Sequence, residues 1–275
     1  MANITAAAVN ELRQRTGVGM MDCKKALVEC DGDMNKAIDY LREKGQKLAV
    51  KRADRDASEG CVLAGTNKDK TFGAIIMLNC ETDFVAKNED FINFTQKVLN
   101  AAIENRIADA EKVNAMILDG SSVENLIVDQ IAKIGEKITI SHYESLEAPA
   151  VYSYIHNGNR LATLVAFNKP GFDEQGHDVA MQIAAMAPLA LDQKDVPADV
   201  IEKEMKVYRE QIKEEGKPEN MIEKIAEGKL NKFFKENTLL NQDFIKESKQ
   251  TVLQYLQSKD KELKATKFYR LILGE

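Results

Sequence analysis

Residues 61–80 read CVLAGTNKDKTFGAIIMLNC, and this stretch sets the fold class. Residues 61–64 are apolar and residues 72–80 are rich in branched side chains, as strands usually are. Residues 66–70 lie between them and have the polar composition of a turn. We therefore predict a β-hairpin at this position.

The elements around this hairpin occur twice along the chain. A helix predicted over residues 91–105 and a strand over residues 137–143 complete the first set. The second set has strands at residues 151–155 and 161–167, with a turn at residues 157–159 between them. A helix at about residues 176–191 and a last strand at residues 267–273 follow. We interpret the two sets as copies of one α+β unit. All five prolines lie at or after Pro149, which places the boundary near residues 148–150.

Residues 1–45 are typical of three short helices. Thr5 and Asp33 can cap the first and third helices, and two glycines within residues 16–19 separate the first from the second. Gly45 is predicted to end the third helix. The charged residues 46–56 either extend that helix or form a linker. A bundle this small buries little core, and such a domain is more often a docking module than an enzyme.

The second copy is interrupted by residues 195–241, which predict an antiparallel pair of helices with a narrow apolar seam. Gly216, Lys217 and Pro218 form the turn between the helices. The side chains of the seam are Ile201, Met205, Tyr208 and Ile212 in the first helix and Ile222, Ala226, Leu230 and Phe233 in the second. Such an arm is either a solvated hairpin or a grip for a partner or a second copy.

The composition excludes several classes of protein. A formal net charge of −6 argues against non-specific binding of nucleic acid. No stretch approaches the roughly 18 consecutive apolar residues of a membrane span, and the N-terminus does not read as a secretion signal. The four cysteines (Cys23, Cys30, Cys61 and Cys80) have no zinc-site spacing and are expected to be reduced core residues. Together these features predict a cytoplasmic protein that binds neither nucleic acid nor membranes.

The sequence carries no recognisable catalytic motif. It contains three histidines (His142, His156 and His177), and it lacks a glycine-rich dinucleotide motif, a phosphate-loop lysine motif and a zinc-protease motif. We therefore predict no catalytic residues, no metal site, no cofactor and no enzyme activity.

Two stretches of the sequence resemble those of a known protein family. Residues 13–27 read RQRTGVGMMDCKKAL and residues 79–87 read NCETDFVAK, and both resemble the signature segments of the elongation factor Ts family. Supporting similarities occur at residues 134–136, 154–156 and 228–230. The resemblance implies an N-terminal three-helix domain similar to ubiquitin-associated domains, a two-part core and a coiled-coil insertion. The domains expected are residues 1–54, 55–147 and 148–275, with the insertion at 195–241.

The resemblance also implies a function, which is guanine-nucleotide exchange on elongation factor Tu during the elongation step of protein synthesis. The factor would bind the GDP-bound and nucleotide-free forms, and a homodimer or a 2:2 complex is compatible with this role. In the family, an aspartate-phenylalanine pair enters the GTPase near its Mg²⁺ ion and disturbs ion binding. The resemblance assigns this role to Asp83 and Phe84, which Thr82 and Val85 frame; these four residues are here called the tetrapeptide 82–85.

The resemblance assigns anchoring contacts to Arg13, Met20, Met21 and His156. Anchors are needed because a roughly 10⁴-fold effect requires about 5.5 kcal/mol of differential binding. Burial of Phe84 would supply only about 1.5–3 kcal/mol.

Each of these residues also has an ordinary structural interpretation. Phe84 could pack under its own hairpin, one of Met20 and Met21 could belong to the core, Arg13 could be an exposed charge, and His156 could be a hydrogen-bonded turn residue. Two other functions stay open on the sequence. One is a ubiquitin-associated-like adaptor that uses residues 17–27, and the other is an enzyme that uses His156 with a nearby carboxylate.

Overall fold

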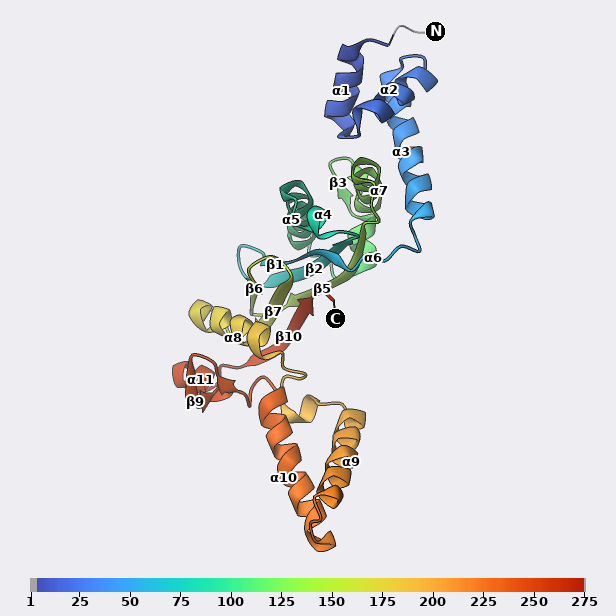
Figure 1. Cartoon of the computed structure of the whole chain (residues 1–275). Helices are drawn as coiled ribbons and strands as arrows, with labels where there is room; N and C mark the ends of the chain where they lie inside the picture. Colours follow the sequence, from blue (N-terminus) through green and yellow to red (C-terminus); the bar gives the residue numbers. More distant parts are fainter. Residues whose placement is uncertain (1–3, 275) are drawn as a thin grey trace.

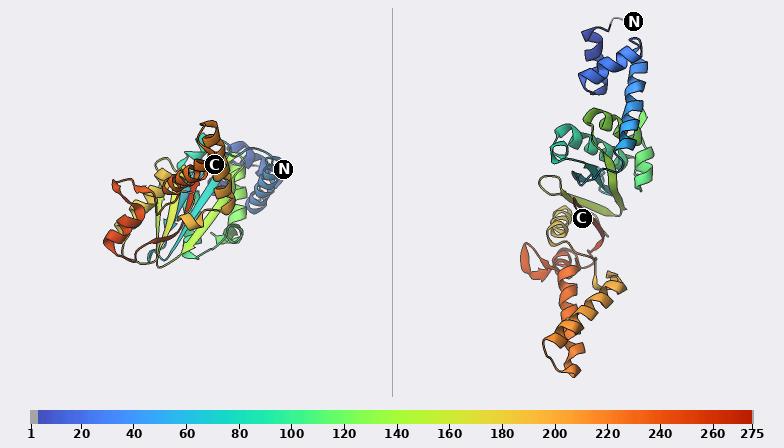
Figure 2. Two further views of the ribbon diagram at one scale, coloured as in Figure 1. Left: turned by 90° about the horizontal axis from the view of Figure 1, so that it is seen from below. Right: turned by 45° about the vertical axis from the view of Figure 1, so that its right-hand side comes forward.

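The computed structural model describes residues 4–274 and is elongated. A helical bundle lies at one end, a core of helices and sheets lies in the middle, and a helical hairpin lies at the other end (Figures 1 and 2). The mixture of helix and sheet confirms the predicted α+β class. Among residues 4–274, no helix combines the length and the apolar character that crossing a bilayer requires.

The N-terminal bundle consists of α1 (Ala6–Thr16), α2 (Met20–Glu29) and α3 (Met34–Lys51). The Thr5 side chain accepts a hydrogen bond from the amide of Ala8, and the Asp33 carboxylate accepts from the amides of Asn35 and Lys36, so both predicted caps are present. The likeness of this bundle to ubiquitin-associated domains stays a prediction.

The prediction that Gly45 ends the third helix is wrong, because α3 continues to Lys51. The glycine has a packing reason instead. A Cβ atom at this position would lie 2.9 Å from the Cβ of Ala132 and 3.0 Å from the carbonyl oxygen of Val128. Both of these residues belong to α7 (Val123–Ile134). The missing side chain therefore lets α3 and α7 approach closely.

The core contains two three-stranded antiparallel sheets with the same connectivity. In each sheet a hairpin is joined by a strand that comes later in the chain, and this later strand pairs with the second strand of the hairpin. The first sheet has the order β1-β2-β5 and the second the order β6-β7-β10. The strands are β1 (Glu59–Thr66), β2 (Phe72–Cys80), β5 (Thr139–Glu147), β6 (Ala150–Ile155), β7 (Leu161–Phe167) and β10 (Ala265–Ile272).

The two sheets pack face to face, and helices cover their outer faces (Figure 1). Side chains such as Val62, Ile75 and Leu164 fill the space between the sheets. The outer face of the first sheet packs against α5 (Glu89–Glu104), α6 (Ala110–Ala115) and α7, and that of the second against α8 (Asp173–Met186) and α11 (Val252–Lys259). Because both faces are covered, every residue of the two central strands, β2 and β7, is buried.

Helix α8 differs from its predicted range of about 176–191. It begins at Asp173, and it ends at Met186 because Ala187 adopts the left-handed conformation and Pro188 follows. The remaining short elements are α4 (Asp83–Ala86), β3 (Ile117–Leu118), β4 (Ser121–Ser122), η1 (Gln193–Asp195), β8 (Asp243–Phe244) and β9 (Glu247–Thr251).

The arm consists of α9 (Ala198–Glu214) and α10 (Glu219–Asn237). Met205, Ile212, Ile222 and Ala226 form a small buried cluster between the two helices, and three further predicted seam residues pack against it: Ile201, Tyr208 and Leu230. Phe233, the eighth predicted seam residue, is not part of this cluster. Backbone hydrogen bonds fix the base of the arm to the chain that follows α8, including one of 2.8 Å from the amide of Leu189 to the carbonyl of Asn237. The arm projects from the core (Figures 1 and 2). The apolar side chains of its seam are buried between its own two helices.

Candidate functional site

The tetrapeptide 82–85 lies at the start of a single turn of helix, α4. Thr82 precedes α4 as its N-cap, and its hydroxyl accepts a 3.4 Å hydrogen bond from the amide of Val85. Val85 and Ala86 pack against the cluster between the first sheet and its helices. The turn therefore has an inner apolar side that fixes it to the core.

Phe84 points away from that core. Its side chain is 85% exposed, so the interpretation that it packs under its own hairpin is wrong. Beside it, Asp83 forms a 2.6 Å ion pair with Lys87. The hydrogen bond from Lys87 holds the pKa of the Asp83 carboxyl below its usual value. The turn thus presents a large apolar ring next to a carboxylate that stays ionised at neutral pH.

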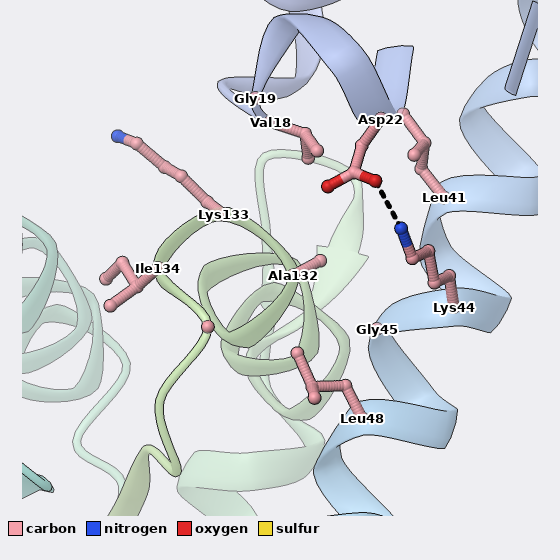
Figure 3. Close-up of a pocket in the computed structure, with 11 residues that line it drawn as sticks. Val18, Gly19, Asp22, Leu41, Lys44, Gly45, Leu48, Ala132, Lys133 and Ile134 are labelled. Carbon is pink, nitrogen blue, oxygen red and sulfur yellow. Dashed lines mark hydrogen bonds and ion pairs between the residues drawn. The ribbon is translucent and has the colours of Figure 1, made fainter. Parts of the chain in front are cut away.

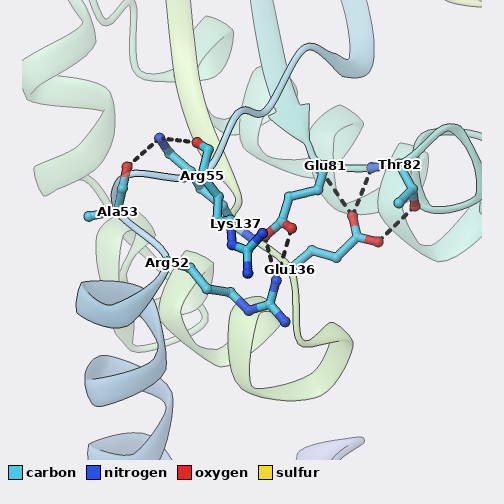
Figure 4. Close-up of polar contacts among 7 residues, drawn as sticks. All are labelled: Arg52, Ala53, Arg55, Glu81, Thr82, Glu136 and Lys137. Atoms are coloured by element: carbon cyan, nitrogen blue, oxygen red, sulfur yellow. Dashed lines mark hydrogen bonds and ion pairs between the residues drawn. The ribbon is translucent and has the colours of Figure 1, made fainter.

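Glu136 holds the start of this turn (Figure 4). One carboxylate oxygen accepts hydrogen bonds from the amides of Glu81 and Thr82, each at 3.0 Å. The other accepts the Thr82 hydroxyl at 2.7 Å. Glu136 comes from the segment between α7 and β5, far from the tetrapeptide in the sequence.

Glu81 completes the network with its own side chain. Its carboxylate accepts the amide of Lys137 at 2.6 Å and the guanidinium of Arg52 at 2.7 and 2.9 Å (Figure 4). The bond from the Lys137 amide, followed by the contact with Arg52, lowers the pKa of the Glu81 carboxyl. Arg52 directly follows α3, so the network joins the end of the bundle to the start of the tetrapeptide.

His156 lies in the turn between β6 and β7, as predicted, and is exposed. Its ring contacts the Tyr154 hydroxyl at 3.0 Å. The same turn reaches the start of β1, where Arg160 forms an ion pair with Glu59. Because Glu59 is paired with Cys80 in the sheet, the His156 turn and the tetrapeptide belong to the same end of the first sheet.

The predicted anchors of the bundle are exposed. Met20 is 48% and Met21 is 77% exposed in the first turn of α2, and Arg13 is exposed on α1. The expectation that one methionine belongs to the core is wrong, because Cys23 and Leu27 take the buried positions of α2. The two methionines are therefore available to a partner.

The bundle meets the core at α7. Arg42 donates two 3.1 Å hydrogen bonds to Asp129, and Ala132 packs against the buried cluster of the bundle. A cavity of about 370 Å³ lies at this junction, lined among others by Leu41, Leu48 and Ala132 (Figure 3). The helix that receives the bundle therefore leads, after one residue, to the Glu136 that holds the tetrapeptide.

Metal-ligating and nucleophilic side chains are the other candidates for a functional site in this chain. Within residues 4–274, no cluster of three or more His, Cys, Asp or Glu side chains could hold a metal ion. In the same range no carboxylate forms an ion pair with His156. Burial raises the pKa of the Cys61 thiol to about 11 and that of Cys80 to about 12, so neither is a thiolate at neutral pH.

The sequence did not reveal the roles of Arg52, Glu81, Glu136 and Lys137. Glu81 and Glu136 lie within or beside the segments that carry the family resemblance. Their hydrogen bond joins residues 55 positions apart and depends on the fold, so residue spacing alone could not reveal it.

The chain is similar to proteins of known family over its whole length. The sequence model of a family described as "Elongation factor TS" matches residues 81–275. A protein named "Elongation factor Ts" from Christiangramia forsetii is 51% identical over 280 residues and covers 100% of both chains. Proteins of the same name from Flavobacterium psychrophilum and Amoebophilus asiaticus are 49% identical (100% of both chains) and 50% identical (98% of this chain and 99% of the relative).

Proposed function

The chain belongs to the elongation factor Ts family, and from this premise we propose that it releases GDP from elongation factor Tu. The match to the family over the whole chain confirms the resemblance carried by residues 13–27 and 79–87. The family's members are nucleotide exchange factors that serve translation elongation. The proposed exchange proceeds by protein binding without covalent chemistry, in the cytoplasm.

The observation that carries the proposal is the exposure of Phe84 on a fixed turn. An exposed aromatic ring is costly in water and is typical of a residue that a partner covers. The turn beneath it is held by the core on one side and by Glu136 on the other. A rigid apolar group can enter a partner with little loss of conformational entropy.

The proposed target is the Mg²⁺ and phosphate region of the GTPase. Translational GTPases hold GDP through contacts to its phosphates and a bridging Mg²⁺ ion. A factor that binds the empty form better than the GDP form must weaken GDP binding by the same factor. In this proposal Phe84 and Asp83 disturb the ion region, while Thr82 and Val85 hold them in place.

The affinity of the complex must come largely from elsewhere. A roughly 10⁴-fold effect needs about 5.5 kcal/mol of differential binding, and burial of one Phe provides about 1.5–3 kcal/mol. We assign the remaining contacts to Arg13, Met20 and Met21 on the bundle and to His156 beside the first sheet. All four side chains are exposed, as contact residues must be.

The test is the release of labelled GDP from purified elongation factor Tu, followed with and without this protein in the presence of excess unlabelled GDP. The proposal predicts faster release in proportion to the added protein until the GTPase is saturated. Release at the intrinsic rate at every concentration of the protein would contradict it.

A further inference from the structure

We propose that Glu136 is a positioning residue that holds the tetrapeptide 82–85 in its active conformation before the partner binds. The conformational part of this inference concerns the free protein. Its kinetic part rests on the exchange function proposed above.

The contacts of Glu136 converge on the start of the turn. Its carboxylate accepts three hydrogen bonds, from the amides of Glu81 and Thr82 at 3.0 Å and from the Thr82 hydroxyl at 2.7 Å. Hydrogen bonds to a charged acceptor are about twice as strong as neutral ones. The Thr82 hydroxyl also accepts a hydrogen bond from the amide of Val85. Glu136 therefore fixes, through Thr82, the residue that follows Phe84.

The two segments bind each other in both directions. The Glu136 carboxylate accepts a hydrogen bond from the backbone amide of Glu81. The Glu81 carboxylate in turn accepts a 2.6 Å hydrogen bond from the backbone amide of Lys137. Arg52 lies on the Glu81 carboxylate and balances its charge. Each segment therefore fixes the backbone of the other, which a single side-chain contact could not do.

Gly135 brings Glu136 to this place. It ends α7 in the left-handed conformation, with φ of 84°, which other residues adopt only with strain. The chain reverses at this glycine, and the next residue is Glu136. The position of Glu136 is therefore set by the end of α7, the helix that also packs against the N-terminal bundle.

Phe84 depends on this arrangement because it has little contact of its own with the protein. At 85% exposure, its position is set by the backbone of α4 and hardly by packing. Val85 and Ala86 fix one side of the turn, and Glu136 fixes its beginning. Loss of Glu136 leaves the fold supported by its buried clusters but leaves Phe84 without a defined direction.

The first test uses hydrogen exchange in the free, full-length protein. Glu136→Ala is compared with Glu124→Ala, a matched control at an exposed residue in the first turn of α7. We expect the amides of residues 81–85 to exchange at least about tenfold faster in Glu136→Ala than in the wild type or the control. Unchanged exchange in this segment would overturn the proposal without bearing on the exchange function.

The second test is a double-mutant cycle on GDP release from elongation factor Tu. Glu136→Ala should lower the release rate at saturation by at least about tenfold in the wild-type background. In the Phe84→Ala background it should lower the rate by less than about twofold, because Glu136 acts through the turn. Equal effects in both backgrounds would overturn the positioning role, since a general loss of structure affects both alike.

Glu136→Gln keeps the size of the side chain and one acceptor oxygen, and guards against a folding defect in the alanine variant. We expect Glu136→Gln to have the same Tm as the Glu124→Ala control. Its GDP release rate should lie between those of the wild type and Glu136→Ala. If Glu136→Gln and Glu136→Ala are both folded and both release GDP at the wild-type rate, the proposal is rejected. If the wild-type protein itself fails to accelerate release, the exchange function is rejected and the hydrogen-exchange result still decides the conformational part.

Discussion

Phe84 and Phe91 are near each other in the sequence and opposite in exposure, at 85% and 1%. Phe84→Ala should therefore change the free energy of unfolding by no more than about 0.5 kcal/mol. Phe91→Ala removes a ring from the buried cluster under the first sheet and should cost about 3–5 kcal/mol. Urea unfolding of the two variants measures both values. A large loss of stability in Phe84→Ala would mean that its ring packs on the protein after all.

Glu81 gives the network a pH dependence with a defined sign. The amide of Lys137 and the guanidinium of Arg52 lower the pKa of its carboxyl from the ordinary value of 4.5. The ionised form therefore stabilises the folded state above 4.5, and this contribution is lost as the pH falls through the lower folded value.

We expect Glu81→Gln to lower the Tm at pH 7 and to lose this effect in acid, where the wild-type carboxyl is itself protonated. Thermal unfolding across the pH range measures the difference, with Glu124→Gln as a control for the change in charge. A difference between Glu81→Gln and the wild type that stays constant with pH would show that ionisation of the Glu81 carboxyl does not account for the loss of stability.

At the level of single residues, the family resemblance named candidate contact positions but did not give their local structure. The tetrapeptide 82–85 was identified through its family resemblance, yet its helical form depends on the Thr82 cap and on Glu136. The burial of Met20 and Met21 was misjudged because the apolar face of α2 is set by contacts with α1 and α3. Local spacing carries no information on such contacts.

Among the elements, two helical glycines with opposite surroundings offer a matched comparison. A Cβ atom on Gly176 of α8 would lie 2.2 Å from the buried ring of Tyr152, whereas a Cβ atom on Gly228 of α10 would meet nothing within 4 Å. Gly176→Ala should therefore cost about 1–3 kcal/mol of stability through overpacking. Gly228→Ala should gain about 0.5–1 kcal/mol, since alanine favours a helix.

Denaturant unfolding of the two glycine variants decides this prediction. If Gly176→Ala were as stable as the wild type, α8 would not pack closely on the second sheet at Tyr152.

Elements with strong local patterns were predicted well. Both hairpins, the strand 267–273 and the seam of the arm follow from alternation, turn composition and helical spacing, and all are present. The errors lie where packing overrides a local signal. Gly45 has the composition of a helix end, but its contact with Ala132 and Val128 makes it a close-approach residue inside α3.

Across the whole molecule, the proposed contacts come from two separate places, the bundle and one end of the first sheet. The variant with both Met20→Ala and Met21→Ala should raise the concentration of factor needed for half-maximal GDP release by about tenfold. Its release rate at saturation should stay near that of the wild type, because the tetrapeptide is untouched. Titration of the factor against labelled-GDP-loaded elongation factor Tu separates the two quantities.

Val28→Ala is the control for the methionine pair, because Val28 is 53% exposed on the same helix and is not among the proposed contacts. It should leave both quantities unchanged. The adaptor alternative places all partner binding in the bundle and predicts that deletion of residues 1–54 abolishes binding. Binding that persists through the core would reject that alternative.

The central claim is that the tetrapeptide 82–85 of this elongation factor Ts family member drives GDP release. The most direct measurement is the rate of release from elongation factor Tu at saturating factor, for the wild type and for Phe84→Ala. We predict a large acceleration by the wild type and a maximal rate at least about tenfold lower for Phe84→Ala, in line with the free energy of burying one Phe side chain. Equal maximal rates for the two proteins would contradict the account.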